Sequence, residues 1–154
     1  MSVRVQREIF DVGYEIAALS RNRADIGAIV SFTGLVRDRS DMAEAKSELE
    51  ALDLEHYPGM TEKALERLET EARERWPLKD LTIIHRYGRL HRAEPIVFVG
   101  TASAHRAVAF ESAAFLMDYL KTSAPFWKRE IGADGLGEWV DARESDNQAA
   151  ARWL

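Results

Sequence analysis

Cysteine is absent from this chain of 154 residues. The protein can therefore form neither a disulfide scaffold nor a zinc–thiolate or iron–sulfur site, and no cysteine can serve as a nucleophile. For the same reason, the chain cannot carry sulfur as a persulfide of its own.

Long apolar runs and an excess of basic residues are absent too. No apolar run approaches the roughly 18 residues that a membrane helix needs. Charged residues such as Arg4, Arg7 and Asp11 interrupt the N-terminal region, where a signal peptide would have its apolar core. Lys and Arg number 21 against 26 Asp and Glu, which is not the balance of a general nucleic-acid binder. We therefore expect one cytoplasmic domain over residues 1–154, with no nucleic-acid or membrane partner.

The spacing of apolar residues predicts the secondary structure. Helices are expected over 60–76 and 105–121, ended by Pro77 and Pro125, and a shorter helix over 12–21. Strands are expected over 3–10, 26–36, 50–57, 81–87, 95–103, 126–131 and 137–142, with the strand over 26–36 apolar on both faces and therefore buried. Because the order is mixed and includes hairpins, we predict an α+β fold with a largely antiparallel sheet.

Three segments between or after these elements carry further predictions. Gly88 and Arg89 indicate a tight connection between two of the strands. The charged stretch over 37–49 is expected to be a mobile loop, and the tail over 146–154 a terminal helical turn.

Metal and nucleotide motifs are missing from the sequence. None of the four histidines has HxH or HExxH spacing, and neither GxGxxG nor GxxxxGK[ST] occurs. His85 shares a strand face with Leu81 and Ile83, so a core histidine with its hydrogen bonds satisfied is favoured over a metal ligand. We expect no metal and no other cofactor on this chain.

The charge distribution favours the second half of the chain for an anionic ligand. Residues 38–75 contain 12 acidic and 6 basic side chains, whereas residues 76–131 contain 5 acidic and 8 basic ones. In that second half, His105 and Arg106 open a helix, where free backbone N–H groups favour anions. The pair is either an anion site or an exposed arginine capped by Ser103, and the spacing leaves both readings open.

Two lysines flank an aromatic turn in the stretch KTSAPFWK. Lys121 closes a helix, where cations are favourable in any case, and Lys128 lies in a strand, where an edge lysine discourages aggregation. The same two residues could also form a cationic pocket, in which a partly desolvated lysine next to another cation has a lowered pKa and can exchange protons. Phe32 and Arg37 flank the glycine-containing strand end FTGLVR. They are candidate site residues only if the fold brings them close to this turn.

Seven segments together resemble one known family. They are GAIVSFTGLVR, LEHYPGMTEKAL, ERWPL, IIHRYG, IVFVGTASAHR, FLMDYLKTSAPFWKRE and ARESD. In this order and at this spacing they resemble the large, catalytic subunit of molybdopterin synthase, the MoaE family, over nearly the whole chain.

The resemblance implies an α/β-hammerhead fold and a homodimer in which each protomer binds one small ubiquitin-like, MoaD-like sulfur-carrier subunit, giving a heterotetramer. It implies a sulfurtransferase of molybdenum cofactor biosynthesis. Sulfur from the thiocarboxylate on the carrier's C-terminal Gly-Gly tail would convert the pterin substrate, cyclic pyranopterin monophosphate, into the dithiolene molybdopterin.

The resemblance also implies roles for individual residues. Lys121 and Lys128 match the catalytic pair, and Lys121 and Phe32 would contact the carrier tail. Substrate contacts would come from Arg37, His105, Arg106 and Arg143, the last reaching into the neighbouring protomer's site. The stretch over 38–49 departs from the glycine- or asparagine-containing turn typical of the family, which leaves its substrate contacts open.

Two alternatives remain beside this hypothesis. One is a partner-binding module that keeps the fold without the chemistry, against which the presence of Lys121 and Lys128 argues. The other is an enzyme that uses the same cations on a different phosphorylated heterocycle without a sulfur carrier. The sequence does not decide which lysine acts as the acid and which holds the carrier tail.

Overall fold

The computed structural model describes residues 2–38, 49–132, 135–137, 139, 148 and 150–154. Within these ranges the helices are α1 (Val12–Ala18), α2 (Met60–Arg75) and α3 (Arg106–Ser123). The strands are β1 (Val3–Gln6), β2 (Ala28–Leu35), β3 (Leu49–His56), β4 (Asp80–Arg86), β5 (Gly88–His91), β6 (Pro95–Ser103), β7 (Phe126–Gly132) and β8 (Gly135–Leu136). None of these helices is long and apolar enough to cross a membrane.

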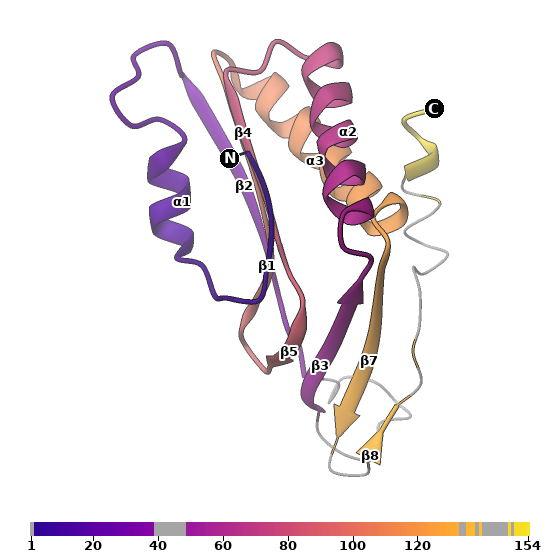
Figure 1. The fold of residues 1–154 in the computed structure, drawn as a ribbon. Coiled ribbons are helices and arrows are strands. Elements are labelled where there is room, and N and C mark those ends of the chain that lie inside the picture. The colour runs from indigo at the N-terminus through magenta and orange to yellow at the C-terminus, as the bar shows by residue number, and fades with distance from the viewer. Residues whose placement is uncertain (1, 39–48, 133–134, 138, 140–147, 149) are drawn as a thin grey trace.

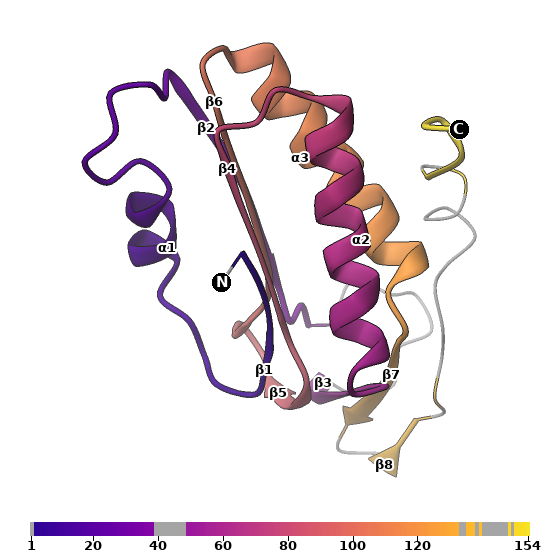
Figure 2. The ribbon, with the colours of Figure 1, turned by 45° about the horizontal axis from the view of Figure 1, so that its top comes forward.

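The first sheet has the strand order β1-β4-β6-β2. Its neighbours are antiparallel except β1 and β4, which run parallel. Helix α1 lies on one face of this sheet, and α2 and α3 lie on the other (Figures 1 and 2). The prediction of an α+β fold with mainly antiparallel strands is confirmed.

The main core lies between this sheet and the pair α2 and α3. Leu65 and Leu68 of α2 and Phe115 and Leu116 of α3 pack there against strand residues such as Ile83. Leu65, Leu68 and Ala72 on α2, and Leu116 and Leu120 on α3, are spaced three or four residues apart, which places each set on one helix face. The apolar stripes that predicted these helices are therefore the surfaces that they bury.

The helix boundaries follow from local chemistry. At the start of α2, the backbone N–H of Gly59 donates to Glu62 (2.6 Å), so that one free donor is satisfied. Helix α3 ends before Pro125, and Ala124 has the extended angles φ −81° and ψ 130° that a following proline favours. The predicted stop at Pro125 is confirmed.

The second sheet has the order β5-β3-β7-β8 and is antiparallel throughout. Asp53 on β3 forms ion pairs with Arg89 on β5 (2.9 Å) and Arg129 on β7 (2.8 Å). Both arginines are its register partners. The predicted tight connection at Gly88 and Arg89 is wrong, because Gly88 (φ 89°) opens strand β5, which leaves the first sheet and pairs with β3.

Three other predictions are corrected or fall outside the described residues. The strand over 26–36 is not buried on both faces, because Phe32 and Leu35 of β2 remain exposed; among the described strands, β2 lies at the edge of its sheet next to β6. The hairpin partner of β7 begins at Gly135 rather than Gly137. Most of 37–49 and of 137–142 lies outside the described residues, and in the tail the described residues 148, 150 and 151 are helical.

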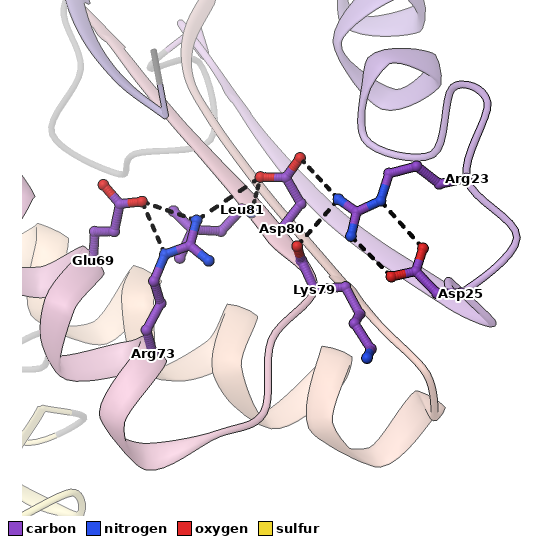
Figure 3. Close-up of polar contacts among 7 residues, drawn as sticks. All are labelled: Arg23, Asp25, Glu69, Arg73, Lys79, Asp80 and Leu81. Atoms are coloured by element: carbon purple, nitrogen blue, oxygen red, sulfur yellow. Dashed lines mark hydrogen bonds and ion pairs between the residues drawn. The ribbon is translucent and has the colours of Figure 1, made fainter.

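Charged side chains tie the start of β4 to two neighbouring segments (Figure 3). Arg23, before β2, pairs with Asp25 at 3.0 Å and reaches Asp80 at 3.6 Å. Arg73 on α2 lies 3.8 Å from the other oxygen of Asp80 and 3.0 Å from Glu69. These groups are partly exposed, so we expect the cluster to contribute little to stability.

Candidate active site

A cavity of about 580 Å³ lies where the two sheets meet. Its walls come from the end of β2, the C-terminal turn of α3, the start of β7 and the inner face of β3. The lining residues are Phe32, Thr33, Gly34, Leu35, Arg37, Leu52, Leu54, His85, Ile96, Val97, Leu120, Lys121, Ala124, Phe126, Trp127 and Lys128. The structure therefore brings together four predicted site residues from separate segments: Phe32, Arg37, Lys121 and Lys128.

The two lysines line the same cavity because helix α3 ends just before Pro125. Lys121 is exposed in the last turn of α3, where the helix dipole favours a cation. The chain then becomes extended, and Lys128 is the third residue of β7, half-buried and paired with Leu54. Cations on a helix end and on the following strand thus line one cavity, as KTSAPFWK predicted.

Gly34 lets the Phe32 side of the cavity form. A Cβ atom at Gly34 would lie 2.8 Å from Cγ1 of Val97 and 3.3 Å from Cε1 of Phe32. The first distance is too short, so a side chain at Gly34 would displace the neighbouring cavity wall. Phe32 itself remains 42% exposed, which makes its ring available to a ligand.

His85 is the cavity residue whose role the sequence did not reveal. The predicted core position of His85 is confirmed, because the side chain is buried, and of its two ring nitrogens Nδ1 lies 2.8 Å from the carbonyl oxygen of Arg86. Its ring also stacks on Phe126 at 3.7 Å. Burial, with smaller contributions from Lys121 and His56 and against the opposing effect of the Arg86 hydrogen bond, lowers the pKa of His85 to about 4. The only signal in the sequence was its place in IIHRYG.

His105 and Arg106 lie away from this cavity. Arg106 begins α3 and Lys121 lies near its end, so about 22 Å of helix separates the two. Both His105 and Arg106 are exposed. His105 occupies the cap position without a side-chain cap bond, and Ser103 donates to its carbonyl oxygen instead of capping the helix. Their substrate contact stays a prediction, and Arg143 lies outside the described residues.

A second hollow of about 610 Å³ runs along the polar face of α2. Charged side chains of both signs and one threonine line it: Lys63, Glu66, Arg67, Thr70, Glu71 and Glu74. It has no aromatic wall and no surplus of cations, so we place the candidate site in the cavity with the lysines. Across the described ranges, no group of three or more His, Asp or Glu residues is placed to hold a metal ion.

Comparisons with known proteins agree with the motifs. A family model described as MoaE protein matches residues 5–123. The molybdopterin synthase catalytic subunit of Mesorhizobium japonicum is 58% identical over 153 residues, covering 99% of this chain and 92% of that protein. The molybdopterin synthase catalytic subunit of Escherichia coli is 56% identical over 144 residues, covering 94% of this chain and 92% of that protein. Among solved structures, the molybdopterin biosynthesis MoaE protein from Burkholderia ambifaria superposes with a TM-score of 0.81 at 50% identity, covering 99% of this chain and 97% of that one. The resemblance read from the sequence is confirmed, and the chain belongs to the MoaE protein family.

Proposed function

We propose that this chain is the catalytic subunit of a molybdopterin synthase, an enzyme of molybdenum cofactor biosynthesis that acts as a sulfurtransferase. It would move sulfur from the C-terminal thiocarboxylate of a small carrier subunit to cyclic pyranopterin monophosphate. The observation that carries the proposal is the cavity in which Lys121, Lys128 and Arg37 meet, in a chain whose relatives are named molybdopterin synthase catalytic subunit.

The charge of the cavity suits both reactants. A thiocarboxylate and a cyclic phosphate are both anions, and bringing them together costs Coulomb energy unless fixed cations offset it. Arg37 offers a planar guanidinium that can bind phosphate through two hydrogen bonds, whereas the lysines can also exchange protons. We therefore assign phosphate binding to Arg37 and proton transfer to the lysine pair.

Each sulfur insertion can be written with these groups. The thiocarboxylate sulfur attacks a side-chain carbon of the pterin, so that a C–S bond forms and a C–O bond breaks. A lysine ammonium gives its proton to the departing oxygen. Water then cleaves the acyl–sulfur bond, which releases the carrier as a carboxylate and leaves sulfur on the product. The mechanism uses no protein thiol on this subunit, which agrees with the absence of cysteine from the chain.

The carrier tail fits the Phe32 side of the cavity. Two glycines have no side chains, so the tail can pass close to Phe32 and Gly34 and end near Lys121. The word subunit in the relatives' names implies a partner, and a MoaD-like carrier with a Gly-Gly end is the one that this chemistry requires.

A homodimer would bring His105 and Arg106 into the reaction. The length of α3 prevents them from reaching the substrate beside Lys121 of the same chain. A second protomer that placed its exposed α3 N-terminus over the cavity would supply them as phosphate contacts. Two such protomers with one carrier each would form a heterotetramer.

Reconstitution tests the proposal. Purified chain, thiocarboxylated carrier and cyclic pyranopterin monophosphate should yield the dithiolene product, and a carrier with an ordinary carboxylate should yield none. A chain that captures the carrier and gives no product would be the partner-binding module instead. A chain that neither captures the carrier nor forms product would point to another phosphorylated heterocycle.

A further inference from the structure

His85 differs chemically from the other polar side chains that line the cavity. Arg37, Lys121 and Lys128 are donors only, and the hydroxyl of Thr33 can donate or accept. A ligand held by these groups satisfies its acceptors readily, but its own N–H groups need an acceptor in the wall. The imidazole of His85 can supply one if the correct nitrogen is unprotonated.

The hydrogen bond to Arg86 fixes which nitrogen that is. A carbonyl oxygen can only accept, so Nδ1 of His85, at 2.8 Å, must carry the hydrogen. In the neutral ring, Nε2 then has the lone pair. Stacking on Phe126, with ring centroids 3.7 Å apart and planes inclined by 16°, fixes the orientation of the ring.

The surroundings keep this ring neutral. The charged or titratable groups around it are Lys121 on α3, His56 on β3, Lys128 on β7 and Arg86 on its own strand. Burial, Lys121 and His56 all lower the pKa of His85, which stands at about 4. At neutral pH the Nε2 atom is therefore an acceptor in a cavity of cations.

The Nε2 atom is also available to a ligand. Among the described residues it has no hydrogen-bond partner. The described side-chain nitrogens that are both fully enclosed by protein and without a partner are Nε of Arg4 and Nε of Arg129, so Nε2 of His85 is not one of them. We propose that His85 is a further binding residue of the site, whose Nε2 accepts a hydrogen bond from an N–H group of the molecule held by Lys121 and Lys128. The inference rests on the proposed function, and the N–H group belongs either to the carrier's Gly-Gly tail or to the pterin.

Two variants of His85 separate this role from packing. Asn places its amide near Nδ1, so His85→Asn keeps the bond to Arg86 and removes the acceptor at the Nε2 position. Gln reaches further, so His85→Gln restores a polar group there. We expect His85→Asn to raise the KM or Kd of one reactant about 10-fold, the effect of one lost hydrogen bond, with kcat less affected. His85→Gln should recover most of that loss. The matched control is His91→Asn, which changes an exposed histidine of β5 outside the cavity.

Nitrogen NMR of the wild-type chain provides a direct readout that does not depend on any variant folding. With ¹⁵N-labelled histidine, Nε2 of His85 should show the unprotonated signal and shift when a donor binds. Carboxylate-ended carrier and cyclic pyranopterin monophosphate are added separately, and the one that shifts Nε2 identifies the source of the N–H group. No shift with either, or reactant affinities in His85→Asn equal to wild type, would overturn the inference. Failure of the wild-type reconstitution would instead reject the proposed function, whatever the NMR result.

Discussion

Removing the charge of Asp53 tests how the second sheet supports the cavity. Asp53 on β3 accepts hydrogen bonds from Arg89 (2.9 and 3.1 Å) and from Arg129 (2.8 Å). Side chains alternate along a strand, so this cluster lies on the face opposite Leu52 and Leu54, which line the cavity. Asp53→Asn therefore weakens the pairing of β3 with β7 without changing the cavity wall.

The size of the effect follows from burial. The side chain of Asp53 is 13% exposed and that of Arg129 is 24% exposed, whereas Arg89 is 53% exposed and can return to water. Nε of Arg129 has no partner, so this guanidinium depends strongly on the carboxylate. Losing the charged acceptor should cost about 2–3 kcal/mol in the free energy of unfolding. For a chain of this length, that lowers Tm by roughly 5–10 °C.

The dependence on pH identifies the cause. Hydrogen bonds from Arg89 and then Arg129 lower the pKa of Asp53 below its ordinary value. A lowered pKa in the folded state stabilises the protein above the unfolded pKa of about 3.9, and the effect is lost as the pH falls through the folded value. The gap in Tm between wild type and Asp53→Asn should be full at pH 7 and close below about pH 4.

Thermal unfolding at several pH values measures this gap. Asp25→Asn is the control, because the pair of Asp25 with Arg23 has similar geometry but is more exposed, and Tm should change little. Equal losses of Tm in the two variants, or a gap independent of pH, would refute the reasoning. Turnover well below the unfolding transition should remain close to wild type.

Three further outcomes concern the cavity and α3. Lys128→Ala should lower turnover about 10²–10⁴-fold while folding and carrier affinity stay nearly intact; turnover within a few-fold of wild type in the reconstituted assay would exclude a proton-transfer role. His105→Ala and Arg106→Ala should each weaken precursor binding by about 1.5–3 kcal/mol with little effect on carrier binding, and unchanged affinity in calorimetry would argue against an anion site there. Any covalent carrier adduct should map to Lys121, and Lys121→Ala should weaken sulfur transfer; peptide mapping that finds the adduct at Lys128 or at surface Lys63 would reverse the assignment.

Features that depend on nearby residues could be predicted from the sequence. The stripes of α2 and α3 follow a period of 3.6 residues, and Pro125 ends α3 through its direct neighbour, Ala124. The pocket formed by Lys121 and Lys128 belongs to this class, since both lysines lie within four residues of Pro125, where the helix gives way to the strand. Phe32 and Arg37 were candidates from the strand end FTGLVR, the motif resemblance supported them, and the structure places them in the same cavity.

Features that depend on pairing between distant strands could not be predicted. The apolar composition of β2 indicated a buried strand, but its position at the sheet edge is decided by β6, about seventy residues later. Gly88 was interpreted as a turn because a glycine with positive φ serves a turn and a change of sheet equally well. His85 could be identified as a core residue but not as a cavity residue, because the other cavity residues come from distant segments that include β2, β3, β6, α3 and β7.

The position of the cavity between two sheets shapes how the site responds to change. Arg37 and Phe32 approach from the edge of the first sheet, and Lys128 comes from the second, so the distance between phosphate-binding and proton-transferring groups depends on how the sheets pack. Val36, Leu52, Leu54 and Leu90 form the small buried cluster that joins them.

Truncating Leu54, which is 6% exposed and pairs with Lys128, removes contacts on both sides of that joint. Leu54→Ala should therefore lower stability by about 2–5 kcal/mol and also lower kcat at temperatures where the variant is folded. Asp53→Asn, which acts on the opposite face of the same strand, should lower stability alone. Equal kcat in the two folded variants would show that packing at this joint does not set the geometry of the site.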